Sequence, residues 1–227
     1  MKILAMADLH GDLDIYLQLK RLVGSYDVQV VVLAGDLLEA FRSDLTIEQA
    51  QRENANQIVE VLKSLSIPVL YIMGNDDLIE LGYQDNLIQS IHVQRVIIGR
   101  YAFVGYQYSL PFMLGIFEKA EPEIQKDMLT IDPLLDEKTV FITHSPAYGV
   151  RDEGIHIPTR DIHAGSRSIL EAIQRRRVRA HIHGHIHQCF GRDGIHFNVA
   201  AAGRVRGMVI NLDDLTHEEI DGEKTKK

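Results

Sequence analysis

Four of the eleven histidines of this sequence stand within seven residues, at positions 181, 183, 185 and 187. Neutral imidazole is a common protein ligand for transition metals. His185 and His187 stand two residues apart after Gly184, so a turn could direct two ring nitrogens into one site. A remnant of an affinity tag would lie at a terminus and would not alternate with isoleucine. The pattern therefore predicts a metal site whose carboxylate ligands come from elsewhere in the chain.

Polar side chains also follow four apolar runs earlier in the sequence, at the point where each run ends. They are Asp8 and His10 after the run 3–7, Asp36 after 28–34, Asn75, Asp76 and Asp77 after 69–73, and His144 after 140–143. Taken singly, such a residue is usually a turn residue or a helix cap. In an open α/β sheet, however, the carboxyl ends of parallel strands line one edge, and ligands bind there. We therefore expect these groups to converge with the histidine cluster.

The apolar runs alternate with helical patterns in the first part of the chain. Helical spacing is found at two sets of apolar residues, Ile15, Leu19 and Leu22, and Ile58, Leu62 and Leu65. Continuous apolar runs such as 28–34 and 69–73 are typical of strands that are covered on both faces. Strands and helices in alternation predict parallel pairing through right-handed crossovers, and hence an α/β fold.

The pattern changes in the middle of the chain. Shorter β-rich segments at 96–98 and 102–106 predict a second, partly antiparallel sheet. Residues 109–130 are interpreted as an insertion near the site, with a helix that begins after Pro122.

The last third of the chain predicts one more helix and further strands. Ser166 is a suitable N-cap for the helix. The segments 195–200 and 208–212 have the composition of strands, and we expect them to close a sheet. The charged tail 213–227 is expected to be partly disordered.

Composition and charge limit the class of protein. The chain has 227 residues, 45% of them hydrophobic, so we expect one domain over residues 1–227. A net charge of -8 argues against a surface built for nucleic acids or anionic membranes, but does not exclude a small anionic substrate. The single cysteine, Cys189, allows no internal disulfide, and no apolar run reaches membrane-spanning length. These features predict a cytoplasmic protein, and they carry no signal for an oligomeric state.

The sequence resembles the calcineurin-like metallophosphoesterase superfamily in an ordered set of motifs: Asp8-x-His10, Gly35-Asp36, Gly74-Asn75, His144 and Gly184-His185-x-His187. The resemblance extends over nearly the whole chain and is closest to the small, single-domain, phosphodiesterase-like members. It implies a four-layer α/β/β/α sandwich of two mixed β-sheets flanked by helices. It also implies that the protein is a metal-dependent phosphoesterase.

The resemblance further implies two metal sites that share one carboxylate. Asp8, His10, Asp36 and His187 would bind one divalent ion, and Asp36, Asn75, His144 and His185 the other. A water that the two ions share would become the hydroxide nucleophile near neutral pH. Nitrogen and oxygen ligands together suit manganese, iron, zinc, nickel or cobalt. The expected substrates are phosphodiesters or other small phosphorylated molecules.

The third motif departs from the family pattern. Asp76 stands where most members have a histidine beside the leaving group. An ionised Asp76 would repel a phosphate, so its carboxyl must be protonated, turned away or drawn onto a metal. Asp77 matches the acid that follows in the family and is predicted to support the ligands. A replacement proton donor could come from His156, His163, His181 or His183, and His163 is our candidate.

Two other functions are compatible with these residues. A scaffold of the same fold could retain the metals but lack catalysis, and Asp76 is the one residue that favours this hypothesis. A nuclease would need a basic groove, for which the only candidate is the short run 175–179. At the carboxyl end of a helix, that run more simply complements the helix dipole. Retention of all seven presumed ligands favours the enzyme.

Overall fold

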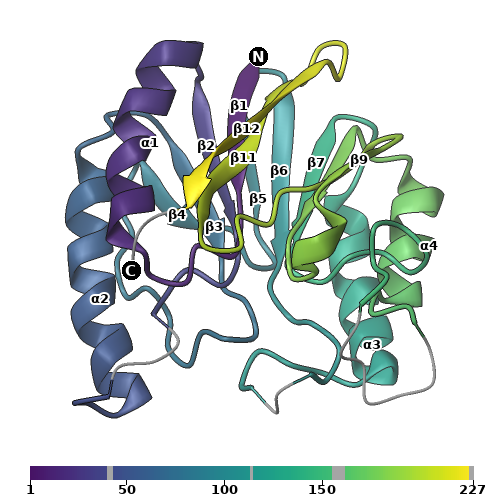
Figure 1. Cartoon of the computed structure of the whole chain (residues 1–227). Coiled ribbons are helices and arrows are strands. Elements are labelled where there is room, and N and C mark those ends of the chain that lie inside the picture. Colours follow the sequence, from purple (N-terminus) through teal and green to yellow (C-terminus); the bar gives the residue numbers. More distant parts are fainter. Residues whose placement is uncertain (40–42, 113–114, 155–161, 225–227) are drawn as a thin grey trace.

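Two six-stranded sheets pack face to face, and helices cover both outer faces (Figure 1). The computed structural model describes residues 1–39, 43–112, 115–154 and 162–224. The helices α1 and α2 cover the first sheet, and α3 and α4 cover the second (Figure 1). The fold is therefore the predicted four-layer α/β/β/α sandwich.

The first sheet has the strand order β12-β11-β1-β2-β3-β4. Its parallel strands are β1 (Lys2–Met6), β2 (Val30–Ala34), β3 (Val69–Ile72) and β4 (Ile88–Ser90). The helices α1 (Leu13–Tyr26) and α2 (Ile47–Lys63) connect the first three of these strands. Two antiparallel strands, β11 (Arg204–Asn211) and β12 (His217–Lys224), extend the sheet on the other side of β1.

The second sheet has the strand order β5-β6-β7-β8-β10-β9. Its strands are β5 (Arg95–Ile98), β6 (Tyr101–Tyr106), β7 (Thr139–Thr143), β8 (Ala180–His183), β9 (Gly191–Asp193) and β10 (His196–Asn198). The helix α3 (Glu121–Ile131) with the short η1 (Asp132–Leu134) leads into β7, and α4 (Arg167–Arg176) leads into β8. A single turn, η2 (His187–Cys189), follows β8. The edge pairs β5-β6 and β10-β9 are antiparallel, so this sheet is mixed as predicted.

The apolar side chains form a core in each gap between layers. Phe103, Ile142 and Met208 are fully buried between the two sheets, and separate clusters lie under the two helix layers. The residues of β2 are all buried because both faces of this strand are covered, which agrees with its unbroken apolar run.

Local signals place the helices close to where the sequence predicted them. Ser166 caps α4 by accepting a hydrogen bond from the backbone N–H of Ile169, as predicted, and Pro122 lies in the first turn of α3. The arginines at the end of α4 pair within the molecule, since Arg175 and Arg176 both contact the carboxylate of Asp132. Two arginines of this run are therefore paired with the carboxylate of the residue that ends α3.

The structure departs from two expectations at the C-terminal end. Residues 217–224 were expected to belong to a partly disordered tail, but they form β12, whose Ile220 is buried and pairs with Gly207 of β11. The charged residues that suggested disorder lie on an edge strand, where charge discourages pairing with other chains. The segments 195–200 and 208–212 also do not close one sheet, because β10 and β11 belong to different sheets.

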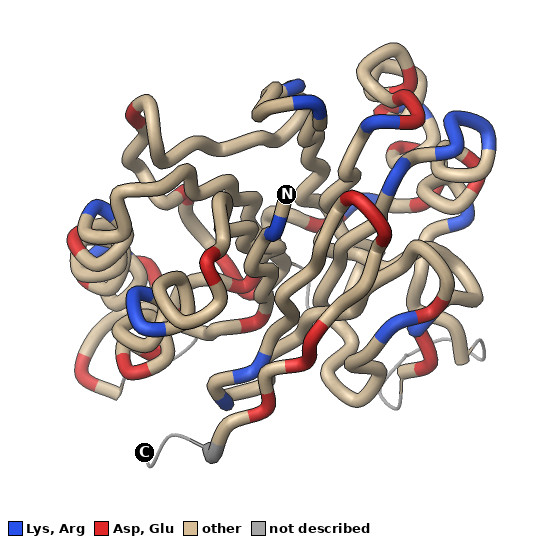
Figure 2. The backbone as a smooth tube through the Cα atoms, turned by 90° about the horizontal axis from the view of Figure 1, so that it is seen from above, with Lys and Arg blue, Asp and Glu red and all other residues tan. Residues whose placement is uncertain are grey.

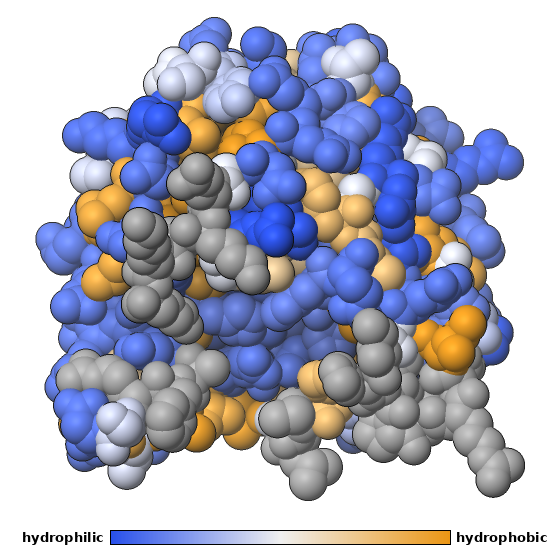
Figure 3. Space-filling view, viewed as in Figure 1, coloured by the Kyte–Doolittle hydropathy of each residue, from blue (hydrophilic) through white to orange (hydrophobic). Residues whose placement is uncertain are grey.

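Charged side chains of both signs are mixed over the surface. Lysine and arginine are distributed along the tube on both sides of the molecule and are interspersed with acidic residues (Figure 2). The face seen in Figure 3 is mainly hydrophilic, with apolar side chains in small groups. Among the described residues, no helix has the length and apolar character needed to span a bilayer.

Candidate metal centre

The residues of the predicted site lie at one edge of the molecule, where strands of both sheets end. Asp8 and His10 follow β1, Asp36 follows β2, Asn75 follows β3, His144 follows β7, and His185 and His187 follow β8. This edge lies opposite the N-terminus of the chain (Figure 1). The packing of the sheets thus brings together residues up to 179 positions apart in the sequence.

The first group of side chains consists of Asp8, His10 and His187, whose possible ligand atoms lie within 4.8 Å of one another. The Nε2 atoms of His10 and His187 are 3.4 Å apart, and Nε2 of His187 is 3.2 Å from Oδ1 of Asp8. Asp8 is fully buried, and its carboxylate also accepts a hydrogen bond from the backbone N–H of His185. Two imidazole nitrogens and one carboxylate oxygen therefore face one point.

The second group consists of Asp8, Asp36 and His144, again within 4.8 Å. Nδ1 of His144 donates a hydrogen bond to the carbonyl oxygen of Ala34 at 2.9 Å, which leaves Nε2 directed at the site. This Nε2 lies 3.4 Å from Oδ1 of Asp36 and 2.9 Å from Oδ1 of Asn75. A ring nitrogen, a carboxylate oxygen and an amide oxygen are thus arranged as ligands of one ion would be.

A third group contains Asp76 together with His10 and Asp36. Oδ1 of Asp76 accepts a hydrogen bond from the side-chain amide of Asn75 at 2.9 Å, and Oδ2 lies 3.6 Å from Nδ1 of His10. The backbone N–H of Asp76 donates to Oδ1 of Asp36 at 2.9 Å. The side chain at this unusual position is therefore not turned away from the site.

His185 lies beside these groups without belonging to one of the three. Its ring centroid is 5.1 Å from that of His144 and 5.3 Å from that of Phe112. Phe112 was not singled out from the sequence, because a lone aromatic residue in an irregular segment has no periodic pattern. Burial lowers the pKa of His185 to about 4, so its ring is neutral, which is the form that binds metals.

The backbone is strained at four of the predicted ligands. The φ angle is 56° at Asp8, 45° at His10, 52° at Asp36 and 69° at His185, in the left-handed region. Residues other than glycine adopt this conformation infrequently, and each instance costs on the order of 1–3 kcal/mol. Such strain is concentrated at functional sites, because the surrounding structure must hold it in place. Here the conformation occurs at four predicted ligands shortly after their strands.

The charges of the site shift the pKa values of its buried groups. Burial opposes the ionisation of Asp8, but the hydrogen bond from His187 and the charge of His144 lower its pKa overall. Burial also opposes the ionisation of Asp36, and its pKa is nevertheless strongly lowered by His144. At His144 burial disfavours the charged ring, but the charge and hydrogen bond of Asp36 raise its pKa to about 10. Without an ion, His144 therefore carries the positive charge that balances the carboxylates.

Asp77 accepts hydrogen bonds only from backbone groups of neighbouring loops, as far as the described residues show. Its carboxylate accepts from the N–H groups of Leu37 at 3.0 Å, Leu38 at 2.8 Å and Gly74 at 2.8 Å. Burial and the charge of Asp36 raise its pKa to about 8. Because these loops carry Asp36 and Asn75, the contacts fit the supporting role predicted for Asp77.

Two amides on the inner face of α2 also hold the site loops, and the sequence interpretation missed them. Gln51 donates to the carbonyl of Asp76 at 2.8 Å and accepts from the N–H of Leu78 at 2.7 Å. Asn54 donates to the carbonyl of Gly11 at 2.9 Å and accepts from the N–H of Glu39 at 3.1 Å. The signal was present, since these amides stand three residues apart on an otherwise apolar helix face.

Some residues considered from the sequence belong to none of the three groups, which were sought among the described residues. Nδ1 of His163 is 2.8 Å from Oδ1 of Asp152, and its ring lies beside Tyr148, so its role as proton donor stays a prediction. Cys189 donates through Sγ to the carbonyl of Glu153. His181 and His183 lie within β8, and His156 lies outside the described residues.

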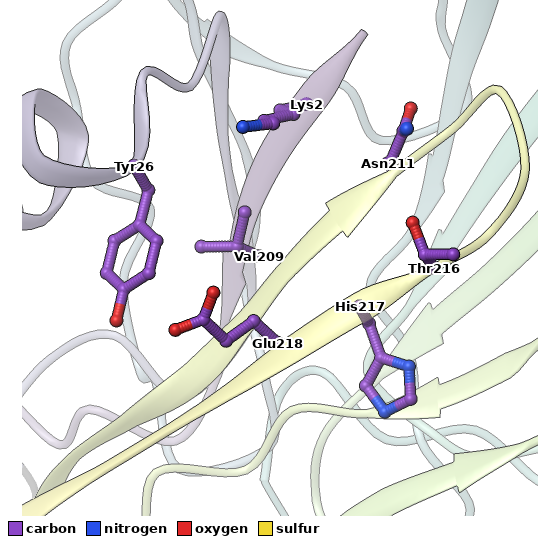
Figure 4. Close-up of a pocket in the computed structure, with 7 residues that line it drawn as sticks. All are labelled: Lys2, Tyr26, Val209, Asn211, Thr216, His217 and Glu218. Carbon is purple, nitrogen blue, oxygen red and sulfur yellow. The ribbon is translucent and has the colours of Figure 1, made fainter.

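Two surface pockets lie apart from the predicted ligands. One of about 190 Å³ is found near the start of β1, at the opposite end of that strand from Asp8, and is lined by Lys2, Tyr26, Val209, Asn211, Thr216, His217 and Glu218 (Figure 4). The other, of about 550 Å³, is lined by residues of the segment 80–94 together with Tyr71. Neither lining contains a predicted metal ligand.

The motifs, fold and clustered ligands agree with the comparison to known families. Residues 1–189 match the calcineurin-like phosphoesterase family. The chain therefore belongs to this family of metal-dependent hydrolases. No curated protein matched the chain in sequence.

Solved structures share the fold at low sequence identity. TT1561 of Thermus thermophilus is 14% identical, with a TM-score of 0.67 over 97% of this chain and 98% of the other. A dimetal phosphatase from Danio rerio is 11% identical, with a TM-score of 0.57 over 98% and 99%. GAP50, the anchor in the inner membrane complex of Plasmodium, is 11% identical, with a TM-score of 0.51 over 100% and 90%. The shared fold thus serves proteins with different described roles.

Proposed function

We propose that the protein is a dinuclear, metal-dependent phosphoesterase that hydrolyses phosphodiesters or other small phosphorylated molecules. The observation that carries the proposal is the convergence of imidazole nitrogens and carboxylate oxygens into groups whose possible ligand atoms lie within 4.8 Å of one another. Nε2 of His144 faces Oδ1 of Asn75 at 2.9 Å, and Nε2 of His10 faces Nε2 of His187 at 3.4 Å. Membership of the calcineurin-like phosphoesterase family supports a hydrolase.

The residues present fit two divalent transition-metal ions. We assign Asp8, His10, Asp36 and His187 to one ion and Asp36, Asn75, His144 and His185 to the other, with Asp36 shared. This mixture of nitrogen and oxygen donors suits manganese, iron, zinc, nickel or cobalt. Two ions held in this way supply a water of lowered pKa and a positive charge that binds phosphate oxygens.

The protein itself contributes a fixed and largely dry frame for this chemistry. Asp8, Asp36, Asn75 and His144 are buried, so their positions do not depend on mobile surface side chains. Asp77 and the amides of α2 hold the loops that carry these ligands. Rigid donors that need no rearrangement during the reaction are the main source of electrostatic stabilisation in enzymes.

Hydrolysis assays after metal removal test the proposal. The purified protein is stripped with a chelator and assayed on a chromogenic phosphodiester and its monoester counterpart, with manganese, nickel, zinc or magnesium restored separately. We expect turnover only after a metal is restored. Two bound ions with no turnover under any condition would overturn the proposal and favour the scaffold. Cleavage of single-stranded DNA in preference to both small esters would favour a nuclease.

The pKa of His144 leads to a pH prediction for ion binding. A ring whose pKa is raised to about 10 by Asp36 is protonated at neutral pH, and an ion must displace that proton to bind Nε2. Below pH 10, the affinity for manganese should therefore rise about tenfold per pH unit, with release of about one proton from this ring. Calorimetric titrations in buffers of different ionisation enthalpy measure the protons released. An affinity that does not change between pH 7 and 9 would contradict this prediction.

A further inference from the structure

Asp76 contacts predicted ligands of both ions. Its carboxylate lies between the side chains of Asn75 and His10, which we assigned to different ions. Its side chain is 31% exposed, so it is neither a surface residue nor part of the apolar core. The family pattern places a histidine here, and an acid in the same place needs its own explanation.

The contact with Asn75 fixes the direction of an amide. A side-chain amide has one donor end and one acceptor end, and the carboxylate of Asp76 can accept only from the donor end. Since Nδ2 of Asn75 donates to Oδ1 of Asp76 at 2.9 Å, Oδ1 of Asn75 is directed at His144 and the site. This hydrogen bond acts together with the contact to His144 in selecting the orientation of the amide.

Asp76 lies near Nδ1 of His10, the ring nitrogen that does not face the other predicted ligands. Nε2 of His10 faces His187, whereas Nδ1 is buried and has no hydrogen-bond partner among the described residues. Oδ2 of Asp76 lies 3.6 Å from this Nδ1. A movement of about 0.5 Å would bring the pair within hydrogen-bond distance. Metal-binding histidines usually donate their second N–H to a carboxylate or carbonyl, which fixes the tautomer.

The backbone of Asp76 is held on both sides of the residue. Its N–H donates to Oδ1 of Asp36, and its carbonyl accepts from the side chain of Gln51. The carboxylate therefore extends from a fixed point, and its two oxygens have separate partners. This is the geometry of a residue that positions other groups.

We infer that Asp76 is a positioning residue that orients one ligand of each ion, Asn75 through Oδ1 and His10 through Oδ2. The inference rests on the proposed dinuclear function. It explains why an acid is accommodated in the same group as Asp36. One carboxylate completes the hydrogen bonding of both Asn75 and His10. An asparagine at position 76 has only one side-chain oxygen, so it could not accept from both Asn75 and His10 as the two carboxylate oxygens can.

The test measures binding of the two ions directly, apart from turnover. Zinc is titrated into the stripped wild-type protein and into Asp76→Ala, Asp76→Asn and the exposed control Asp193→Ala. Loss of a supporting partner lowers metal affinity roughly 10- to 100-fold, so we expect Asp76→Ala to weaken both ions by this amount. Asp76→Asn can keep one of the two contacts and should weaken chiefly one ion. Asp193→Ala should bind as the wild type does.

A second measurement uses the wild type alone, in case the variants fold poorly. In the zinc-loaded protein, nitrogen-15 NMR of the imidazole rings should show His10 protonated at Nδ1 and zinc-bound through Nε2. Zinc bound through Nδ1 would overturn the inference, as would equal affinity in Asp76→Ala and wild type. Loss of one ion in Asp76→Ala with the other unchanged would identify Asp76 as a direct ligand and also overturn it. A wild type that binds no zinc would overturn the proposed function itself, whereas the other failures would leave that function intact.

Discussion

Replacement of Asp36 by asparagine should abolish the binding of two ions. Loss of a residue that only supports a metal ligand lowers activity by up to roughly 100-fold, and we expect a larger loss of turnover here. The change keeps the size of the side chain but leaves one ligand oxygen in place of two. Oδ1 of Asp36 lies 3.4 Å from Nε2 of His144, and the carboxylate also belongs to the group with His10 and Asp76. The side-chain amide of asparagine is neutral and has a single oxygen, so it cannot bridge two ions as a carboxylate does. The ligand that both ions would share is therefore lost.

Metal content and hydrolysis of the chromogenic phosphodiester measure this effect together. Asp193→Asn makes the same chemical change at an exposed position and should retain two ions and wild-type turnover. If Asp36→Asn bound two ions with unchanged affinity and turned over normally, the assignment of Asp36 as the shared ligand would be wrong.

Gly74→Ala should have an effect of similar size, although it adds only one methyl group. A Cβ at this position would meet Oδ1 of Asp36 and Cε1 of His144 at distances that real Cβ atoms do not show. The backbone of Gly74 is not in the left-handed region, so the cost is steric, and it falls on the backbone nitrogen of Asp36 as well as on the two side chains. Because the surrounding loops are buried and hydrogen bonded, these side chains cannot both move aside. We expect a loss of ion binding and of turnover exceeding roughly 100-fold, by the same reasoning as for Asp36.

Gly24→Ala is the matched control for this change. Gly24 lies in α1, and a Cβ there would meet nothing within 4 Å. Alanine in a helix interior is favoured over glycine by about 0.5–1 kcal/mol, so this variant should be slightly more stable and fully active. Denaturant unfolding and the zinc titration distinguish the two variants. Normal ion binding in Gly74→Ala would show that the site is less rigid than the packing indicates.

Most of the predicted ligands could be proposed from the sequence because they stand directly after strands. Asp8, Asp36, Asn75 and His144 each end a buried apolar run, and the alternation of runs with helical patterns places those ends at one edge. Two mixed sheets were expected from the strand patterns and from the family resemblance, whereas the six strands of each sheet are seen only in the structure. The spacing of apolar residues depends only on neighbours in the sequence, and it is sufficient to predict buried strands and the helices between them.

The remaining features depend on contacts that no local pattern contains. The Asp76 side chain contacts Asn75 and His10, and His10 lies far away in the sequence. The strand β12 forms by antiparallel pairing with β11. Its own charged sequence is typical of a free tail and does not predict this pairing. The role of Gln51 likewise becomes visible only when α2 is packed against the loop of Asp76, whose carbonyl this side chain binds.

The origin of the predicted ligands in two different sheets has a thermodynamic consequence. Asp8, His10 and Asp36 follow strands of the first sheet, while His144 and His187 follow strands of the second. Any ion bound by both sets acts as a cross-link between the two halves of the sandwich. The unfolded chain offers no such site, so binding would raise the free energy of unfolding with ion concentration, as for any ligand of the native state alone. Loss of the ions would then loosen the contact between the sheets before it affected either sheet by itself.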